Sequence, residues 1–466
     1  MDRKYNSFKE EIAARLRVDE SFDIVRRYLS VGDDELCLFY IDGFTKDLEM
    51  QRLMQFMISR SGIGSIEQMM RTLPYIEVQE SGNSDDIVRG VLSGQAAILS
   101  TAFPGSAVLV DARTYPARTT SEPNTDRVMQ GAHDGFVETL TMNTALIRRR
   151  IRDPRLTMRH FNIGGSSCTD VVMCYMQGVA DEKLVESIAE RLSSINPRGM
   201  CLGYQSLSES LIRHGWLNPF PKIRTTERPD TAAAQALEGS VLIICDTTPQ
   251  VMILPTSIFD YLQQTDDYYF PPLTGTYLRL VRTVILLLSV IITPLWYLCV
   301  EYAETLPEYL RFLVPDEPGA LPIILQLLLV EAAIDGLKIA SMNTPDMLSN
   351  SLSVVGALLL GDYAVSIGWL CEDVILYMAF VAIANFAQQN VELGYAFKYV
   401  RVLMLILVYF LGIWGFALGA VIFAILVATN RTVGSSRGYL YPLIPFDPFA
   451  MLRLIFRLKK RDFEGK

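Results

Sequence analysis

Apolar and polar residues are distributed unevenly along this chain. The two kinds mix over short distances before residue 280, whereas residues 280–428 are dominated by long apolar runs. A helix needs roughly 20 mostly apolar residues to cross about 30 Å of hydrocarbon. The runs 283–300 and 402–428 are of that order and contain no charged residue. The pattern therefore predicts a membrane protein with a large polar head, not a soluble protein with apolar core helices.

Three further apolar segments are weaker candidates for membrane crossing. Residues 351–370 carry a single charge, Asp362, and residues 374–387 are apolar but short. Residues 321–330 are shorter still and run directly into charged positions. The predicted fold is an α/β cytoplasmic head of two subdomains, followed by an all-α transmembrane domain of four to five membrane segments.

Basic residues beside the apolar runs predict the orientation, because short flanks rich in Lys and Arg stay on the cytoplasmic side. Arg279 and Arg282 precede the first run, and glutamates follow it. The tail beyond residue 430 is also basic. Head and tail are both expected in the cytoplasm, which requires an even number of crossings. We therefore expect one segment to be re-entrant, interfacial or broken into two halves, either the one after Leu321 or the glycine-containing run 402–428.

The head is predicted to mix strands and helices. Residues 36–41, 107–110 and 241–245 read as buried strands, and residues 46–59 and 181–195 have helical periodicity. The Asp153–Pro154 pair breaks the chain between two subdomains, and the proline-rich strip 218–229 is expected to be a stiff linker. The expected divisions are 1–152 and 153–230 for the two subdomains, 231–278 for a juxtamembrane segment, 279–430 for the transmembrane domain and 431–466 for a basic cytoplasmic tail.

Charge and rare residues exclude several functions. The formal net charge of -9 gives no reason to expect nucleic acid as a partner. Seven cysteines without close spacing predict reduced thiols and no metal site, and the start of the chain lacks the apolar stretch of an export signal. Three histidines lie outside any nucleophile elbow or nucleotide-binding fingerprint, so no enzyme, catalytic residue or cofactor is expected.

Several motifs resemble those of a known family. The run EPNTDRVMQGAHDGFVETLTMNTALIRRRIRDPRLTMR at 122–159 is similar to the central signature of the GerA family of bacterial spore germination proteins. WLNPFPKIRTTERPD at 216–230 resembles a second family element, and DDYY at 266–269, followed by Gly275, Arg279 and Arg282, resembles the family's entry into the membrane. TDVVMCYMQGVADEKLV, TPDMLSNSLSVVGALLLGD and ILYMAFVAIANFA look closer to the branch typified by the stage V sporulation AF protein.

The resemblance implies a protein of the spore inner membrane that assembles with itself into a ring, expected to be a pentamer, and conducts ions during germination. Proteins like the stage V type are expected to amplify the release of ions, monovalent cations above all. Germinant receptor A subunits are expected to work beside a transporter-like B subunit and a lipoprotein C subunit, or with a small membrane partner. Two rivals remain open: a non-conducting membrane scaffold and a secondary transporter subunit that regulates another germination channel.

Residues 345–370 are the best candidates for a conduit. Small and hydroxyl residues at helical spacing suit either tight helix packing or a narrow wet lumen, and the sequence leaves both open. Apolar neighbours of that stripe are expected to gate by dewetting, and a ring of carboxylates at one mouth would favour cations. The pore and gate candidates are Ser349, Ser353, Val355, Gly356, Leu359 and Asp362.

Two charged groups are further candidates. Glu331, Asp335 and Lys338 are spaced to share one helix face, where they form either an intramembrane ion-pair cluster or ordinary charges at the interface. The resemblance favours a structural or gating ion pair. The second group is a predicted subunit interface, whose arginines could instead be a solvated basic turn at a helix end. It comprises Gly131, Asp134, Phe136, Glu138, Arg148, Arg149, Arg150 and Arg152.

Overall fold

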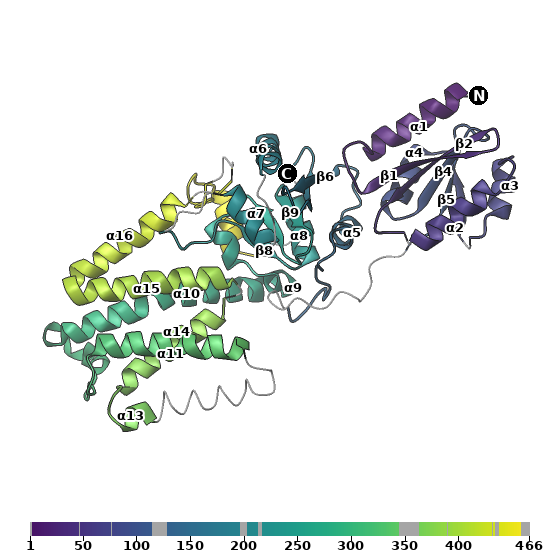
Figure 1. Cartoon of the computed structure of the whole chain (residues 1–466). Coiled ribbons are helices and arrows are strands. Elements are labelled where there is room, and N and C mark those ends of the chain that lie inside the picture. Colours follow the sequence, from purple (N-terminus) through teal and green to yellow (C-terminus); the bar gives the residue numbers. More distant parts are fainter. Residues whose placement is uncertain are drawn as a thin grey trace. The chain divides into compact units, whose positions relative to one another are not determined.

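The computed structural model describes residues 2–45, 47–75, 77–113, 128–195, 203–212, 217–343, 363–388, 390–430, 432–433 and 438–457. The chain divides into two compact units. The amino-terminal unit comprises Met1–His214, Ile223–Thr256 and Thr432–Ser436. The helical unit comprises Gly215–Lys222, Ser257–Arg431 and Arg437–Lys466. Figure 1 shows that the strands belong to the first unit and the long helices to the second.

The first sheet of the amino-terminal unit is antiparallel and covered on both faces. Its strands pair in the order β1-β2-β4-β5-β3. Cys37 and Phe39 pack with α1 and α4, whereas Leu36 and Leu38 pack with α2 and α3. Alternate residues of one strand thus bury on opposite faces, as the period of two requires. The elements are α1 Asp2–Leu16, β1 Ile24–Val31, β2 Asp34–Ile41, α2 Asp47–Ile58, α3 Ile66–Thr72, β3 Val78–Ser81, α4 Ser84–Leu92, β4 Ala96–Ser100 and β5 Ala107–Val110.

The second sheet repeats this design with the order β6-β7-β9-β10-β8, also antiparallel. Ile243 faces α6 and α7, and Leu242 and Ile244 face α5 and α8. The elements are α5 Leu140–Arg150, β6 Leu156–Ile163, β7 Thr169–Met176, α6 Glu182–Ser194, α7 Tyr204–Leu211, β8 Arg224–Thr226, α8 Pro229–Leu237, β9 Val241–Cys245 and β10 Val251–Leu254.

The predicted elements of the head are confirmed. The strands expected at 36–41, 107–110 and 241–245 are β2, β5 and β9, and the helices expected at 46–59 and 181–195 are α2 and α6. Two assignments change. The expected linker contains the edge strand β8, and the expected juxtamembrane segment contains β9 and β10, which belong to the second sheet. The short apolar runs of β9 and β10 are buried on both faces by pairing with neighbouring strands, whereas β8 is polar and pairs with the other edge of β10.

The helical unit contains two helices that are long and apolar enough to cross a membrane. These are α10, with a mean hydropathy of 2.3, and α15, with 1.6; α16 is apolar but shorter. The elements of this unit are η1 Ile258–Leu262, α9 Asp266–Tyr269, α10 Pro272–Glu301, η2 Ala303–Thr305, η3 Glu308–Leu313, α11 Ile323–Asn343, α13 Ala364–Ser366, α14 Glu372–Phe386, α15 Val391–Leu411, α16 Ile413–Thr429 and α17 Pro448–Ile455.

The glycine-containing run 402–428 is broken, one of the alternatives that the sequence leaves open. Gly412 has a φ of 55°, which favours glycine, and it separates α15 from α16. A Cβ atom on Gly415 would lie 1.9 Å from the carbonyl oxygen of Leu407, so only glycine permits the close approach of the two helices. The helices meet at this turn in Figure 1. A single apolar stretch thus forms the end of one helix and the whole of the next.

The helical unit exposes many apolar side chains and buries several polar ones. One stripe of apolar side chains along α10 is exposed, whereas Ser289 and Thr293 on the same helix are almost completely buried. Outward apolar side chains and inward polar groups are expected when the surrounding solvent is lipid. The exposed stripe comprises Leu273, Tyr277, Leu280, Val284, Leu287, Leu288, Ile291 and Leu295.

The four described thiols of the amino-terminal unit are expected to differ sharply in reactivity. Burial raises the pKa of Cys37, Cys174 and Cys245 to about 12, so at pH 8 they are almost entirely protonated. The thiolate is the nucleophile, and Cys168 is exposed. Iodoacetamide at pH 8 should therefore alkylate Cys168 within minutes and leave the three buried thiols unmodified, as peptide mass spectrometry would measure. Comparable labelling of all four thiols would contradict the packing described above.

Candidate functional site

A cluster of four charged side chains joins three helices of the helical unit. Arg401 on α15 is completely buried and donates to Glu331 Oε1 on α11 at 2.6 Å and to the carbonyl oxygen of Ser289 on α10 at 3.0 Å. Lys398, one turn earlier on α15, lies 3.4 Å from the same Glu331 oxygen and also pairs with Asp335. Two carboxylates therefore face two cations, and the cluster has no net charge.

The spacing of these residues explains the pairing. Glu331 and Asp335 are four residues apart on α11, and Lys398 and Arg401 are three apart on α15, so each pair presents one face of its helix. A lone charge among apolar helices is expensive, whereas complementary charges on facing helices compensate each other. The cluster thus fixes which faces of α10, α11 and α15 meet.

The compensation is incomplete. Within the part of the chain that the structure describes, Glu331 Oε2, Arg401 Nε and the Thr293 hydroxyl are buried without a hydrogen-bond partner. Unpaired buried polar atoms cost about 1–3 kcal/mol each, so native structures contain few of them. A rearrangement of the cluster, or the entry of water, would therefore lower the free energy of the helical unit by pairing these three atoms.

Lys338, the third residue of the predicted cluster, has a different contact. Its ammonium group lies 4.8 Å from the centre of the Tyr395 ring, where the quadrupole of the ring attracts a cation. Lys398 and Arg401 were not among the predicted site residues, because the charge-free apolar run begins only after them, at Val402. The signal that could have found them is two basic residues at helical spacing that match the spacing of Glu331 and Asp335.

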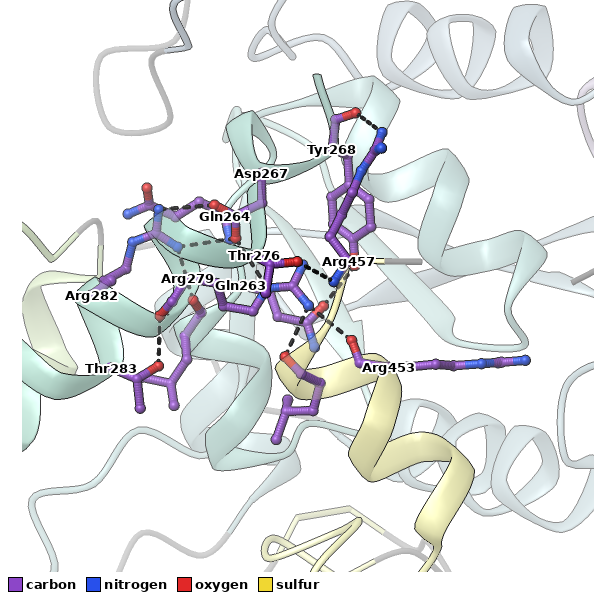
Figure 2. A network of polar contacts seen from close by, with 12 residues as sticks. Gln263, Gln264, Asp267, Tyr268, Thr276, Arg279, Arg282, Thr283, Arg453 and Arg457 are labelled. Atoms are coloured by element: carbon purple, nitrogen blue, oxygen red, sulfur yellow. Dashed lines mark hydrogen bonds and ion pairs between the residues drawn. The ribbon is translucent and has the colours of Figure 1, made fainter. Parts of the chain in front are cut away.

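A second polar network lies at the start of α10 and is shown in Figure 2. Asp267 on α9 is completely buried and accepts from Arg279 Nε at 3.3 Å and from both terminal nitrogens of Arg282 at 3.1 Å. Arg279 also donates to the carbonyl oxygens of Arg453 and Leu454 on α17, each at 2.9 Å. The carboxylate of Asp267 therefore orients both arginines, and Arg279 in turn connects α10 to α17.

Gly275 permits this arrangement, and its replacement by alanine should disrupt it. A Cβ atom at this position would lie 2.2 Å from the carbonyl oxygen of Asp267, so α9 and α10 must move apart. We expect Gly275→Ala to destabilise the helical unit by about 1–3 kcal/mol through overpacking. Gly394→Ala on α15 is the matched control, because its Cβ would meet nothing within 4 Å. Thermal unfolding in detergent should separate the two variants, and equal midpoints would contradict the close approach.

The other sequence candidates have different locations. The pore and gate candidates Ser349, Ser353, Val355, Gly356, Leu359 and Asp362 lie outside the described residues. Among the predicted interface residues, Phe136 is buried in the core under the second sheet, and Asp134 pairs with Arg150 at 2.6 Å. The exposed members of that set are Gly131, Glu138, Arg149 and Arg152.

Arg148 is not at the surface. Its exposed fraction is 0%, and its guanidinium donates to both carboxylate oxygens of Asp23, at 2.7 and 3.0 Å. Further bonds go to the Ser21 hydroxyl at 3.0 Å and to the carbonyl oxygen of Leu156 at 2.9 Å. Arg148 thus connects the residues just before β1 with the first residue of β6. This contact is internal to the amino-terminal unit, in contrast to the exposed Arg149 beside it.

Two antiparallel α/β sheets, followed by helices that expose apolar side chains and bury charged ones, define a membrane-associated protein with a polar head. The chain belongs to the Bacillus/Clostridium GerA spore germination protein family, whose model matches residues 10–465. The resemblance that the sequence motifs predict is therefore confirmed.

Two relatives from Bacillus subtilis agree with this assignment. The chain is 35% identical to stage V sporulation protein AF of Bacillus subtilis, over 97% of this chain and 92% of the relative. It is 27% identical to spore germination protein KA of the same organism, over 95% and 82%. A crystal structure of the N-terminal domain of the A subunit of the Bacillus megaterium spore germinant receptor GerK3 matches with 25% identity and a TM-score of 0.38, covering 53% of this chain and 92% of that one.

Proposed function

We propose that this protein is a subunit of an oligomeric ion channel in the inner membrane of the spore, which releases monovalent cations during germination. The subunits form a ring, expected to be a pentamer, with head and tail in the cytoplasm. The higher identity to stage V sporulation protein AF than to germination protein KA favours the role of an amplifier over that of a germinant receptor A subunit.

The observation that carries this proposal is the combination of exposed apolar side chains and buried charges in the helical unit. Apolar side chains are exposed along α10, and Glu331, Lys398 and Arg401 are buried between helices. Such a unit is suited to lipid, where buried charges usually mark ion pathways or the elements that gate them. Residues 345–370 remain the proposed pore-lining segment on the evidence of their sequence, with Asp362 as the carboxylate of a cation-selective ring.

The rival hypothesis is a non-conducting scaffold that regulates another germination channel. One observation fits it as well as it fits a channel: the described charge cluster pairs internally and joins helices of a single subunit. Such a cluster stabilises the helical unit whether or not the assembly conducts ions. The two functions therefore differ in the role of residues 345–370 and not in the role of the cluster.

Spores that lack this gene provide the first test. Deletion should slow the release of potassium after the start of germination, measured with an ion-selective electrode, and restoring the wild-type gene should reverse the effect. Restoring an Asp362→Asn copy should bring back the protein at normal level but only part of the release rate. Release that is unaffected by the deletion would contradict a role in germination, and full rescue by Asp362→Asn would favour the scaffold.

A further inference from the structure

The last described helix, α17, has the features of an element that lies on a membrane surface. Phe449, Leu452 and Phe456, spaced three and four residues apart along α17 and its C-terminal cap, are between 48% and 67% exposed. Arg453 is exposed beside this stripe, and Arg457 follows one turn later. Exposed aromatic and aliphatic residues next to arginines are typical of helices that insert one face among lipid headgroups.

The contacts of α17 place this face next to the start of α10. The backbone N–H of Arg457 donates to the Thr276 hydroxyl at 3.1 Å, and its guanidinium donates to the carbonyl oxygen of Tyr268 at 2.5 Å, as Figure 2 shows. The exposed stripe of α10 begins here at Leu273 and Tyr277. The C-terminal end of α17 therefore lies beside the start of the α10 stripe, which faces lipid if α10 crosses the membrane.

Two guanidinium nitrogens in this network have spare hydrogen-bonding capacity. Among the described residues, Arg279 Nη2 and Arg457 Nε are buried without a hydrogen-bond partner. Arg279 as a whole is only 2% exposed. Arg457 is partly exposed, so a change of rotamer is enough to present its guanidinium to an acceptor. In Figure 2 the side chain of Arg453 extends away from Asp267. The sequence then continues with Lys459, Lys460 and Arg461, which adds positive charge to this end of the chain.

We propose that α17 and the start of α10 form a binding site for the phosphate of an anionic phospholipid headgroup. Arg453 and Arg457 bind the phosphate, and the buried Arg279 contributes positive charge behind them. The apolar face of α17 inserts between the acyl chains. Arginine suits this task because its planar fork matches a phosphate with two parallel hydrogen bonds. The proposal rests on the membrane-spanning role of α10 but needs no ion conduction.

The test is native mass spectrometry of the purified full-length protein in nonionic detergent, with added phosphatidylglycerol or phosphatidylcholine. We expect phosphatidylglycerol to be retained at least about fivefold more strongly, because each arginine at a membrane surface contributes roughly a factor of five. Arg453→Gln combined with Arg457→Gln should abolish this preference. Arg311→Gln, on η3 after the C-terminal end of α10, is the control that should leave it unchanged. Arg457→Lys, which keeps the charge but lacks the planar fork, should retain a reduced preference, which can be measured even if the glutamine variants are unstable.

Four outcomes would overturn the proposal. The first is equal retention of the two lipids by the wild-type protein. The second is an unchanged preference in the double variant. The third is complete displacement of phosphatidylglycerol by an equal concentration of inorganic phosphate, which would indicate a site for free phosphate.

Phe449→Ser distinguishes lipid from a second copy of the chain, because it should weaken retention of both lipids without changing the oligomer mass. The fourth outcome that would overturn the proposal is a loss of oligomer in this variant with lipid retention unchanged. Loss of channel activity alone would affect none of these readouts.

Discussion

Arg401→Met is expected to destabilise the helical unit by about 3–5 kcal/mol, the usual cost of removing one partner from a buried ion pair. The substitution leaves Glu331 and Asp335 with Lys398 as their single described cationic partner, so the cluster gains a net negative charge in an apolar environment. It also frees the carbonyl oxygen of Ser289. Denaturation in mixed micelles with dodecyl sulfate measures the effect. Tryptophan fluorescence reports on this unit alone, because all four tryptophans of the chain fall within its sequence ranges.

A double variant separates the charge effect from the loss of packing. Glu331→Leu together with Arg401→Met leaves Lys398 paired with Asp335, so no lone charge remains buried, and most of the lost stability should return. Lys338→Met on α11 is the matched control and should cost about 0.5–1 kcal/mol, because it removes only a contact with the Tyr395 ring. If Arg401→Met unfolded like the wild type, the charge cluster would not hold the helices together.

Arg148→Met should produce the second large effect, in the amino-terminal unit. The variant leaves the buried Asp23 carboxylate without its guanidinium partner, which should again cost about 3–5 kcal/mol. Cys174 packs in the same unit and is completely protected, so its alkylation rate in low concentrations of urea reports on opening of the second sheet. We expect this rate to rise roughly 100-fold or more, since each 1.4 kcal/mol is about a factor of ten.

Arg149→Met provides the control for this experiment. Arg149 is the next residue on the same helix and is exposed, so its replacement should change the alkylation rate of Cys174 by less than about threefold. Asp23→Leu combined with Arg148→Met should restore much of the protection, because it removes both buried charges. Equal rates in the two single variants would mean that Arg148 is a surface residue, as the hypothesis of a solvated basic turn states.

The strands and helices of the head could be predicted because their signals are local. The continuous apolar runs of β2 and β9 are buried on both faces of their sheets, and each run is visible in five or six residues. The short strand β8 could not be recognised in a proline-rich strip. It forms because β10 offers an edge with which Arg224–Thr226 can pair.

The charged partners could not be predicted for a different reason. Glu331 and Arg401 are 70 residues apart, and Asp23 and Arg148 are 125 apart, so only the packed structure brings them together. Charges inside apolar stretches also lower the hydropathy that identifies a crossing helix, which is why α15 extends further back than the apolar run indicates. The family motifs predicted the class of protein, whereas the pairing of charges required the fold.

Single-channel recording of the purified protein in planar bilayers tests the central claim most directly. The account predicts discrete cation-selective conductance for the wild type, weaker cation preference for Asp362→Asn, and larger conductance for Val355→Ala and Leu359→Ala, which shrink the proposed apolar constriction. The same preparation should contain a ring of uniform mass. A well-formed oligomer that remains silent in the wild type and in all three variants would contradict the proposal that this chain forms the pore.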